Sequence, residues 1–407
     1  MLAQMKHRID LPAAFIMYGL IMIGIALIYS ATHLDQDVFI RNLFHNQLAW
    51  VVLGTAAFYI TAIIPSRTYY DTAYLFYAFT LLLLVLVVVK GTTAMGATRW
   101  IVLGPLRLQP SELAKIGTVF ALARYLSSKP VSLEKISSLI VPFAMVMVPM
   151  LLIVKQPDLS TALVFCAFTA VMLFWGGLSL AEVFFLLSPI LSLILAFHLF
   201  LWALFFIILF FTLTRFCRNL SVITIILSLN FMVGIILPMA WGKLHDYQKN
   251  RILTFVDPQR DPSGAGYQVL QSQVAIGSGK FLGKGFLEGT QTRLSFLPEQ
   301  HTDFIFSVLG EQFGFIGCLF VLLLFLALIL RLFFLAGEGN NRFLNLCVIG
   351  VAAQLVFHIC VNTAMTVGMM PVTGLPLPFL SYGGNFLISC MALVGFAASI
   401  RKKNQEY

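Results

Sequence analysis

The residues best suited to chemistry in this 407-residue sequence are the charged side chains near position 300. Glu299, His301 and Asp303 alternate directly before a long apolar run. A carboxylate at a boundary between water and an apolar phase suits a general base, because burial raises its pKa toward a useful range. Asp is also a common helix N-cap. Residue types alone leave both interpretations of Asp303 open, and the alternating triplet is weak evidence for a divalent-ion site.

A second pair, Glu112 and Lys115, lies in a run that is otherwise apolar apart from Arg124. Residues three apart share one face of a helix. Ionisable side chains within an apolar span are costly, so they pair with each other or line a cavity. The sequence therefore predicts a structural ion pair, a polar wall of a substrate groove, or both.

Lysines alternate with glycines in the segment that leads to Asp303. Glycine lets backbone N–H groups approach a ligand and cradle an anion, and Lys280 and Lys284 would suit a phosphate. A flexible loop with solvated lysines fits the composition equally well, and no nucleotide-binding pattern is present. The glycines are Gly264, Gly266, Gly277, Gly279, Gly283, Gly285 and Gly289.

The composition sets the solvent in which these residues must work. The chain is 59% hydrophobic and 11% charged, with a mean hydropathy of +0.92. Such a chain cannot cover its surface with polar groups, so we expect lipid around it. This excludes a cytosolic enzyme, a secreted disulfide scaffold and a disordered regulator. Nucleic acid is not expected as a partner, because no soluble basic domain is present. The six cysteines lie in or beside apolar runs without a CxxC pair and are expected to be free.

Apolar runs long enough to cross a bilayer recur along the whole chain, which predicts an all-α, polytopic membrane protein formed as one domain over residues 1–407. The run 180–215 would make a helix of about 54 Å, longer than a hydrocarbon core of about 30 Å. Pro189 and His198 offer breaks, so we expect a helical hairpin there. The twelve predicted spans are 13–31, 46–65, 72–90, 111–127, 137–154, 159–176, 180–197, 199–215, 219–240, 305–335, 344–366 and 383–401.

With twelve spans and a cytoplasmic N-terminus, the short basic loops and the basic tail fall on the cytoplasmic side, as the positive-inside rule requires. Both termini are then cytoplasmic. Three segments fall outside: 90–111 with Arg99 and Arg107, the long loop 241–303, and the Pro- and Gly-broken stretch 367–384. Irregular backbone at membrane depth is tolerated only where it is buried in protein or lines a cavity. We therefore expect an outward-facing cavity whose ligand is amphiphilic and anionic, such as a lipid-linked phosphate.

These segments together resemble the SEDS family of bacterial cell-wall proteins, the RodA, FtsW and SpoVE group. The resemblance runs in order over nearly the whole chain and is closer to the elongation members than to the division members. The matching pieces are Gly96-Ala-Thr-Arg99-Trp100, Gln109-Pro-Ser-Glu112-Leu-Ala-Lys115, Gln156-Pro-Asp158-Leu, His245-Asp-Tyr-Gln248, Asp261-Pro-Ser-Gly-Ala-Gly-Tyr-Gln268, Leu297-Pro-Glu-Gln-His-Thr-Asp303 and Pro371–Gly384.

The resemblance implies a peptidoglycan glycosyltransferase of the bacterial inner membrane that polymerises lipid II into β-1,4 glycan during cell elongation. It implies a core of ten spans, so 180–215 would be an added hairpin. It assigns the catalytic role to Asp303 and cavity roles to Glu112 and Lys115. It also implies a class B penicillin-binding protein as transpeptidase partner, beside lipid II, the nascent glycan strand and membrane lipid.

The chemistry that the resemblance implies is a single inverting displacement, which needs a base and no enzyme nucleophile. Further candidates for contacts with the substrate are Arg99, Lys280, Lys284, Glu299 and His301. No cofactor is assigned, and the sequence leaves open whether a divalent cation, Mg²⁺ or Mn²⁺, meets the diphosphate charge instead of basic side chains.

Two functions from other classes also fit a protein with many spans and a central cavity. A lipid II flippase would need polar groups along a path to both faces, and the internal side lacks a matching cluster. A non-catalytic scaffold for the transpeptidase would leave Asp303 as a helix cap.

Overall fold

The computed structural model describes residues 9–33, 37–94, 97–103, 106–129, 131–133, 136–217, 219–243, 264–294, 296–338 and 341–400, together with 249, 253–255 and 257. Of the sequence motifs above, His245–Gln248 lies outside the described residues, as do Gly96 and residues 261–263.

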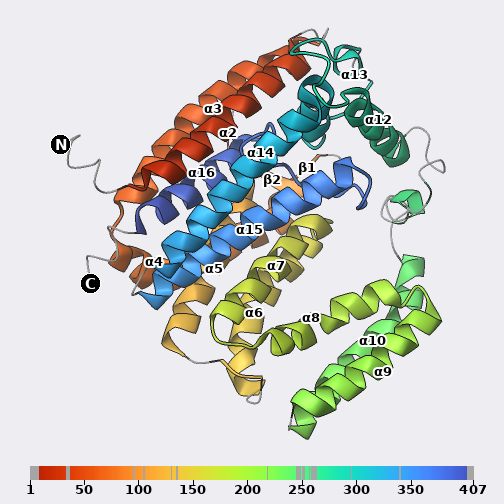
Figure 1. Cartoon of the computed structure of the whole chain (residues 1–407). Coiled ribbons are helices and arrows are strands. Elements are labelled where there is room, and N and C mark those ends of the chain that lie inside the picture. The colour runs from red at the N-terminus through yellow and green to blue at the C-terminus, as the bar shows by residue number, and fades with distance from the viewer. Residues whose placement is uncertain are drawn as a thin grey trace.

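Apolar helices dominate the described chain, as the sequence predicts (Figure 1). Seven are long and apolar enough to cross a membrane: α2 (Leu11–Thr32), α3 (Val38–Ile63), α4 (Ser66–Lys90), α6 (Ile136–Val154), α9 (Leu199–Phe216), α14 (Ile305–Gly337) and α15 (Arg342–Thr366). Shorter apolar runs form α7 (Leu159–Trp175), α8 (Leu180–Leu195), α10 (Leu220–Lys243) and α16 (Gly384–Ala398). The remaining long helix, α5 (Pro110–Ser128), carries Glu112 and Lys115. A multi-pass helical protein is thus confirmed, whereas the count of twelve crossings stays a prediction.

The run 180–215 is divided as predicted, into α8 and α9. The break falls at Ala196–His198, where His198 takes the N-cap position of α9, and Pro189 lies inside α8. Glu182, the one charged residue in its apolar stretch of sequence, completes a capping box with Ser179 and accepts a bond from the Leu133 N–H at 3.1 Å. Such a box satisfies two backbone donors at the start of a helix.

A polar cluster joins α8, α9 and α10 into a group that lies at the lower right in Figure 1. The Asn230 amide donates to the Ser188 hydroxyl at 2.8 Å. The Trp202 indole N–H donates to the Ser192 hydroxyl at 2.8 Å, and that hydroxyl donates to the Asn230 carbonyl at 3.1 Å. Hydrogen bonds of this kind hold helices together in lipid, where apolar contact alone gives little drive.

Segment 90–111, which the topology predicts to be external, forms a small antiparallel sheet that an all-α expectation does not include. Its strands are β1 (Thr92–Ala94), β2 (Ala97–Leu103) and β3 (Leu106–Leu108), in the order β1-β2-β3. The register pairs Ile101 with Leu108 and Leu103 with Leu106. Backbone groups in this short connection between α4 and α5 are thereby hydrogen-bonded to each other.

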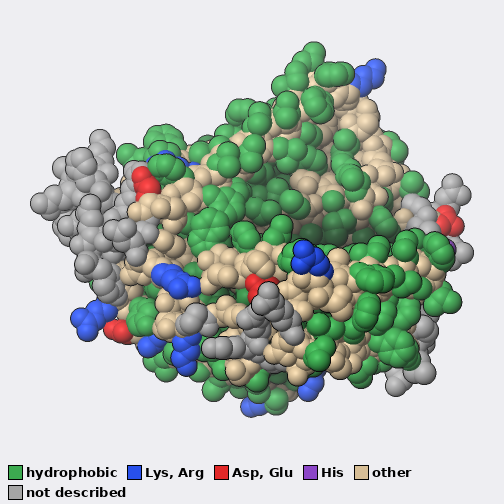
Figure 2. All heavy atoms as spheres, turned by 60° about the horizontal axis from the view of Figure 1, so that its bottom comes forward, with side chains coloured by type: hydrophobic (Ala, Val, Ile, Leu, Met, Phe, Trp, Pro, Cys, Tyr) green, Lys and Arg blue, Asp and Glu red, His purple; other side chains and the backbone are tan. Residues whose placement is uncertain are grey.

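α15 is the most buried of the membrane-length helices and lies in the middle of the bundle, between α14, α7 and α5 (Figure 1). α3 and α16 approach closely, because a Cβ at Gly395 would lie 2.3 Å from the Phe58 carbonyl oxygen. The Asp10 N–H donates to the Ala398 carbonyl. The start of α2 and the end of α16 therefore lie at the same end of the bundle. In Figure 2 apolar side chains form broad areas of the surface, and most of the charged side chains lie in the lower part of the view.

α14 is broken at Gly314, whose φ of 62° and ψ of −159° are not helical. Residues 279–289, here called the clasp, follow α12 (Ala265–Ser278) and cover this break. The clasp carbonyls of Lys280 and Phe281 accept from the N–H groups of Phe315 and Ile316, at 2.9 and 3.2 Å. Its N–H groups at Lys284 and Gly285 donate to the carbonyls of Glu311 and Gln312, both at 3.0 Å. Irregular backbone within a span is thus satisfied by another part of the protein, as it must be.

Candidate functional site

Asp303 lies where the end of the 241–303 segment meets the Pro- and Gly-broken stretch 371–384. The Tyr382 N–H donates to the His301 carbonyl at 2.9 Å, and the Ser381 hydroxyl donates to the Thr302 carbonyl at 2.7 Å. The Asn362 amide donates both to the Asp303 carbonyl at 2.9 Å and to the Leu375 carbonyl at 2.8 Å. These bonds fix the main chain of Asp303 against α15 and the broken stretch.

The Asp303 side chain is partly buried and faces Gly374, where a Cβ would lie 3.6 Å from the Asp303 Oδ2. Gly374 has a φ of 73°, a conformation that favours glycine. The N-cap position of α14 belongs to Phe304, so Asp303 precedes the cap instead of occupying it. A partly exposed carboxylate thus stands beside a residue without a side chain, directly before the N-cap residue of α14.

Glu112 and Lys115 form the predicted ion pair, with 2.9 Å between Lys115 Nζ and Glu112 Oε1. Both are buried, at 1% exposure for Lys115 and 5% for Glu112. Lys115 Nζ also lies 3.3 Å from His358 Nε2, and His358 Nδ1 lies 3.3 Å from the Pro376 carbonyl oxygen. An ammonium can only donate, so Nε2 accepts and the proton of a neutral His358 is on Nδ1, directed at Pro376. The buried pair is thereby linked to the stretch that holds Asp303.

Arg99 joins the site through a different neighbour. Its Nη2 donates to the Pro157 carbonyl at 3.1 Å, and its Nε lies 3.4 Å from the Asp158 carboxylate. Asp158 caps α7 by accepting from the Thr161 N–H. The Ser160 hydroxyl at the same helix start donates to the Thr373 carbonyl at 2.6 Å. Arg99 thus lies near the broken stretch, and its guanidinium contacts the Pro157 carbonyl and the Asp158 carboxylate.

Glu299 and His301 lie together at the outer edge of this region. His301 Nε2 is 3.9 Å from Glu299 Oε2, and the Thr302 hydroxyl donates to the same carboxylate at 3.1 Å. Within the described part of the chain no three His, Cys, Asp or Glu side chains are grouped so as to hold a metal ion. Glu299 and His301 offer too few ligands for a resident divalent cation.

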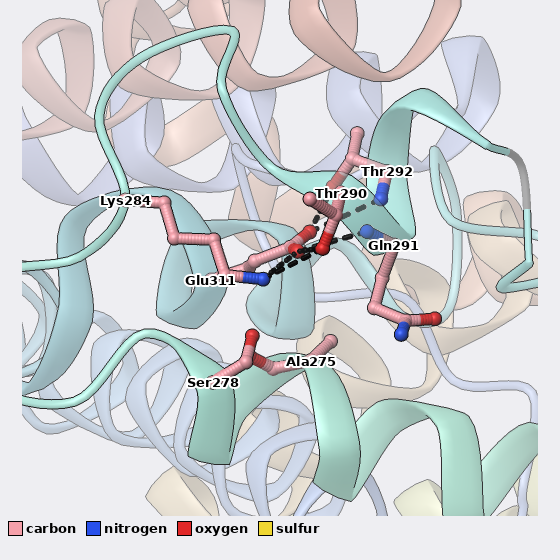
Figure 3. Close-up of polar contacts among 7 residues, drawn as sticks. All are labelled: Ala275, Ser278, Lys284, Thr290, Gln291, Thr292 and Glu311. Carbon is pink, nitrogen blue, oxygen red and sulfur yellow. Dashed lines mark hydrogen bonds and ion pairs between the residues drawn. The ribbon is translucent and has the colours of Figure 1, made fainter.

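Lys284 of the clasp is bound to a carboxylate of the protein itself (Figure 3). Lys284 Nζ lies 2.8 Å from the buried Glu311 carboxylate and 2.7 Å from the Thr290 hydroxyl. The same carboxylate accepts from the N–H groups of Gln291 and Thr292 and from the Thr292 hydroxyl, at 2.8, 3.0 and 2.8 Å. An anion cradle is therefore present, but its anion is Glu311. Lys280 is exposed.

The structure thus connects Asp303, His301, Lys115 and Arg99 to the broken stretch 371–384, and it places Lys284 with Glu311 instead. Sequence reasoning missed the residues that make these connections, namely His358, Asn362 and Ser381. A signal for two of them was present, because His358 and Asn362 are four residues apart in an apolar span and share one helix face.

Comparison with known proteins extends the match over the whole chain. The model of the family described as "Cell cycle protein" (FtsW, RodA and SpoVE) matches residues 8–205 and 198–406. The chain is 34% identical over 398 residues to the peptidoglycan glycosyltransferase MrdB of Escherichia coli (strain K12), covering 97% of this chain and 94% of the relative. It is 32% identical over 421 residues to the peptidoglycan glycosyltransferase RodA of Treponema pallidum (strain Nichols), covering 95% and 96%.

Solved structures agree. A chain of a peptidoglycan synthase complex, described in terms of coordinated polymerization and crosslinking, superposes with a TM-score of 0.73 at 30% identity, covering 98% of this chain and 99% of the other. The crystal structure of the rod shape determining protein RodA of Thermus thermophilus superposes with a TM-score of 0.64 at 26% identity, covering 97% of each chain.

Proposed function

The chain belongs to the FtsW, RodA and SpoVE family of cell cycle proteins and is a peptidoglycan glycosyltransferase, and we propose that Asp303 is its general base. The substrate in this proposal is lipid II, polymerised into β-1,4 glycan on the outer face of the bacterial inner membrane during elongation. The observation that carries the role of Asp303 is its place: a partly exposed carboxylate with a fixed main chain, facing Gly374 at the junction of the external segments.

The reaction that fits this site is one displacement at the anomeric carbon of the donor. The Asp303 carboxylate takes the proton of the acceptor hydroxyl as the hydroxyl oxygen forms the new glycosidic bond. The bond between the anomeric carbon and the diphosphate breaks, and its electron pair leaves with the diphosphate. The configuration inverts once, from an α-linked donor to a β-linked product, so no enzyme nucleophile is needed.

The basic groups at the site differ in how well they suit the departing diphosphate. Lys115 is buried and already bound to Glu112 and His358, so it supports the cavity wall and the broken stretch. Arg99, with 35% side-chain exposure beside Asp158, is the better placed cation. Preorganised positive charge at the leaving group lowers the barrier, because it costs no reorganisation during the reaction. Glu299 and His301 would contact the sugar or peptide portion.

A transpeptidase partner of the class B penicillin-binding type belongs to the same proposal. The superposable chain comes from a complex described as coordinating polymerization and crosslinking, so a partner that crosslinks is the natural counterpart. The proposed topology has both termini in the cytoplasm. The bond between Asp10 and Ala398 supports termini at one end of the bundle.

The test is glycan polymerisation from lipid II by the purified full chain with its transpeptidase partner. Wild type is expected to make polymer, and Asp303→Ala is expected to make none while still binding the partner. A wild-type protein that carries lipid II across vesicle membranes but makes no polymer would favour the flippase. Full polymer from Asp303→Ala would return Asp303 to a structural role.

A further inference from the structure

Two polar contacts between α2 and α14 indicate how deep the clasp, residues 279–289, lies in the membrane. At the cytoplasmic end of the bundle, Arg331 of α14 forms an ion pair with Asp10, the N-cap of α2. At the other end, the Gln312 amide of α14 donates to the Ser30 hydroxyl near the end of α2. Between these contacts each helix rises about 30 Å at its usual pitch, which equals the thickness of a hydrocarbon core, about 30 Å.

The clasp is hydrogen-bonded to α14 at the outer of these two levels. Its four main-chain bonds reach residues 311–316, which include and adjoin Gln312. A hypothetical Cβ at Gly283 would lie 2.1 Å from the Gln312 carbonyl oxygen, so the two backbones are in direct contact. The clasp therefore sits at the outer boundary of the hydrocarbon layer, although its sequence places it in a long external loop.

Large apolar side chains point away from the protein at this level. Phe281 is 72% exposed and Leu282 is 78% exposed. The Phe281 ring contacts the Phe315 ring of α14, with 5.7 Å between centroids. Phe315 and its neighbour Ile316 are themselves more than half exposed, at 57% and 53%. The apolar face of the clasp thus continues the lipid-facing surface of a membrane-spanning helix.

We propose that the clasp is an interfacial anchor that inserts Phe281 and Leu282 among the acyl chains of the outer leaflet. The exposed Lys280, next to them, is placed to meet lipid phosphates. Apolar side chains buried at the headgroup boundary beside a basic one are the usual composition of segments that lie in a membrane surface. Lipid is the occupant that the geometry favours over a partner protein, because the patch is continuous with a surface that already faces lipid.

This anchor would hold the segment that leads to Asp303 against the outer surface of the membrane. The clasp leads through α13 (Thr290–Arg293) to Asp303, and Lys284 and Glu311 join the clasp to α13 and α14. Fixing the clasp in the leaflet therefore limits the motion of the segment that ends at Asp303. The inference does not depend on the role of Asp303 in catalysis.

The test places the photoreactive residue benzoylphenylalanine at position 282 of the full chain, in vesicles of phosphatidylethanolamine and phosphatidylglycerol. Position 323, an exposed leucine deeper in α14, is the lipid-facing control. Position 288, an exposed glutamate of the same clasp, is the control expected to face water. After irradiation, mass spectrometry measures the fraction of protein carrying a lipid adduct.

We expect the adduct fraction at position 282 to lie within about twofold of that at position 323, and at least about tenfold above that at position 288. Adducts at position 282 that match position 288 would overturn the anchor. Crosslinking of position 282 to the transpeptidase partner, with lipid adducts lost when the partner is added, would show a protein-docking surface and also contradict the proposal. A Leu282→Asp variant carrying the probe at position 281 should lose most lipid adducts there.

Discussion

At the scale of single residues, the site is organised by side chains that hold the main chain in place. Asn362 binds the carbonyls of Asp303 and Leu375, and His358 reaches Pro376 while accepting from Lys115. The sequence predicts the pair of Glu112 and Lys115 because their spacing is local. It cannot show that His358 is their third partner, because that contact joins helices 243 residues apart.

The buried ion pair should be strongly interdependent. Lys115→Met leaves the Glu112 carboxylate buried without its cation, so we expect a loss of about 3–5 kcal/mol in the free energy of unfolding. Glu112→Gln together with Lys115→Met should recover much of that loss, because the uncompensated charge is gone. Unfolding in detergent, followed by circular dichroism, measures the cycle. Additive losses would contradict the coupling.

Gln354, one turn before His358 on α15, offers a matched control for that cycle. Its side chain is fully buried, and neither of its amide atoms has a hydrogen-bond partner among the described residues. Gln354→Leu removes buried polar atoms that make no bond, so the free energy of unfolding should stay unchanged or rise.

The Glu311 cradle makes a second residue-scale prediction. Glu311→Gln keeps the shape of the side chain but removes the charge that Lys284 and two backbone N–H groups bind. Hydrogen bonds to a charged group contribute about 1.5–3 kcal/mol, so the unfolding midpoint should fall clearly. Lys284→Met should lower the unfolding midpoint less in the Glu311→Gln background than in the wild type. Equal effects of Lys284→Met in both backgrounds would show that the pair is not coupled.

At the scale of elements, the sequence predicts where helices begin and end, but it does not predict which segments pack against each other. The division of 180–215 at His198 can be predicted from the sequence, because one helix of that length would be longer than the bilayer is thick. The break of α14 at Gly314 cannot be predicted from the sequence, because a glycine in an apolar run is tolerated within a helix. The break exists because the clasp supplies backbone partners from a segment about 30 residues earlier. Two glycines of that segment, Gly279 and Gly283, lie against the backbone of α14, because a Cβ there would be 2.0 and 2.1 Å from the carbonyl oxygens of Gly310 and Gln312.

Gly283 tests this use of glycine. Its φ is 79°, and a Cβ there would lie 2.1 Å from the Gln312 carbonyl oxygen. Gly283→Ala should therefore destabilise the protein by more than about 1 kcal/mol. Gly277→Ala is the control, because no atom lies within 4 Å of its Cβ position and it is helical; it should be neutral or slightly stabilising. Thermal unfolding of the two variants in detergent decides, and equal midpoints would contradict the packing role of the clasp.

At the scale of the whole molecule, composition predicts a multi-pass helical protein, and the charges of the short loops predict its orientation. The sheet at 92–108 is not predicted, because its strands are too short to give a clear alternating pattern. Topology alone predicts that segments 90–111, 241–303 and 367–384 converge, and the bonds from Asn385 to the Arg107 carbonyl and from Tyr382 to the His301 carbonyl show that they meet. Which side chains meet there depends on packing between distant helices.

The orientation makes a prediction about the turn between α8 and α9. If both helices cross the membrane, the exposed Phe197 lies outside the cell. Phe197→Cys, in a background with Cys360→Ser, should react with an impermeant maleimide in intact cells. Arg67→Cys, at an exposed position in the first turn of α4, should react only after permeabilisation. Labelling of position 197 only after permeabilisation would remove the two additional crossings.

The most direct test of the central claim is the rate of glycan polymerisation by Asp303→Asn, with lipid II binding measured on the same preparation. The matched control is Asp37→Asn, because Asp37 is an acid that truly caps a helix, accepting from the Phe39 N–H at the start of α3. A general base contributes about 10²–10⁴-fold to a rate, so Asp303→Asn should lose at least about 10²-fold in rate with binding retained, while Asp37→Asn polymerises like wild type. If Asp303→Asn polymerises at the wild-type rate, the proton is taken by another group and Asp303 is not the base.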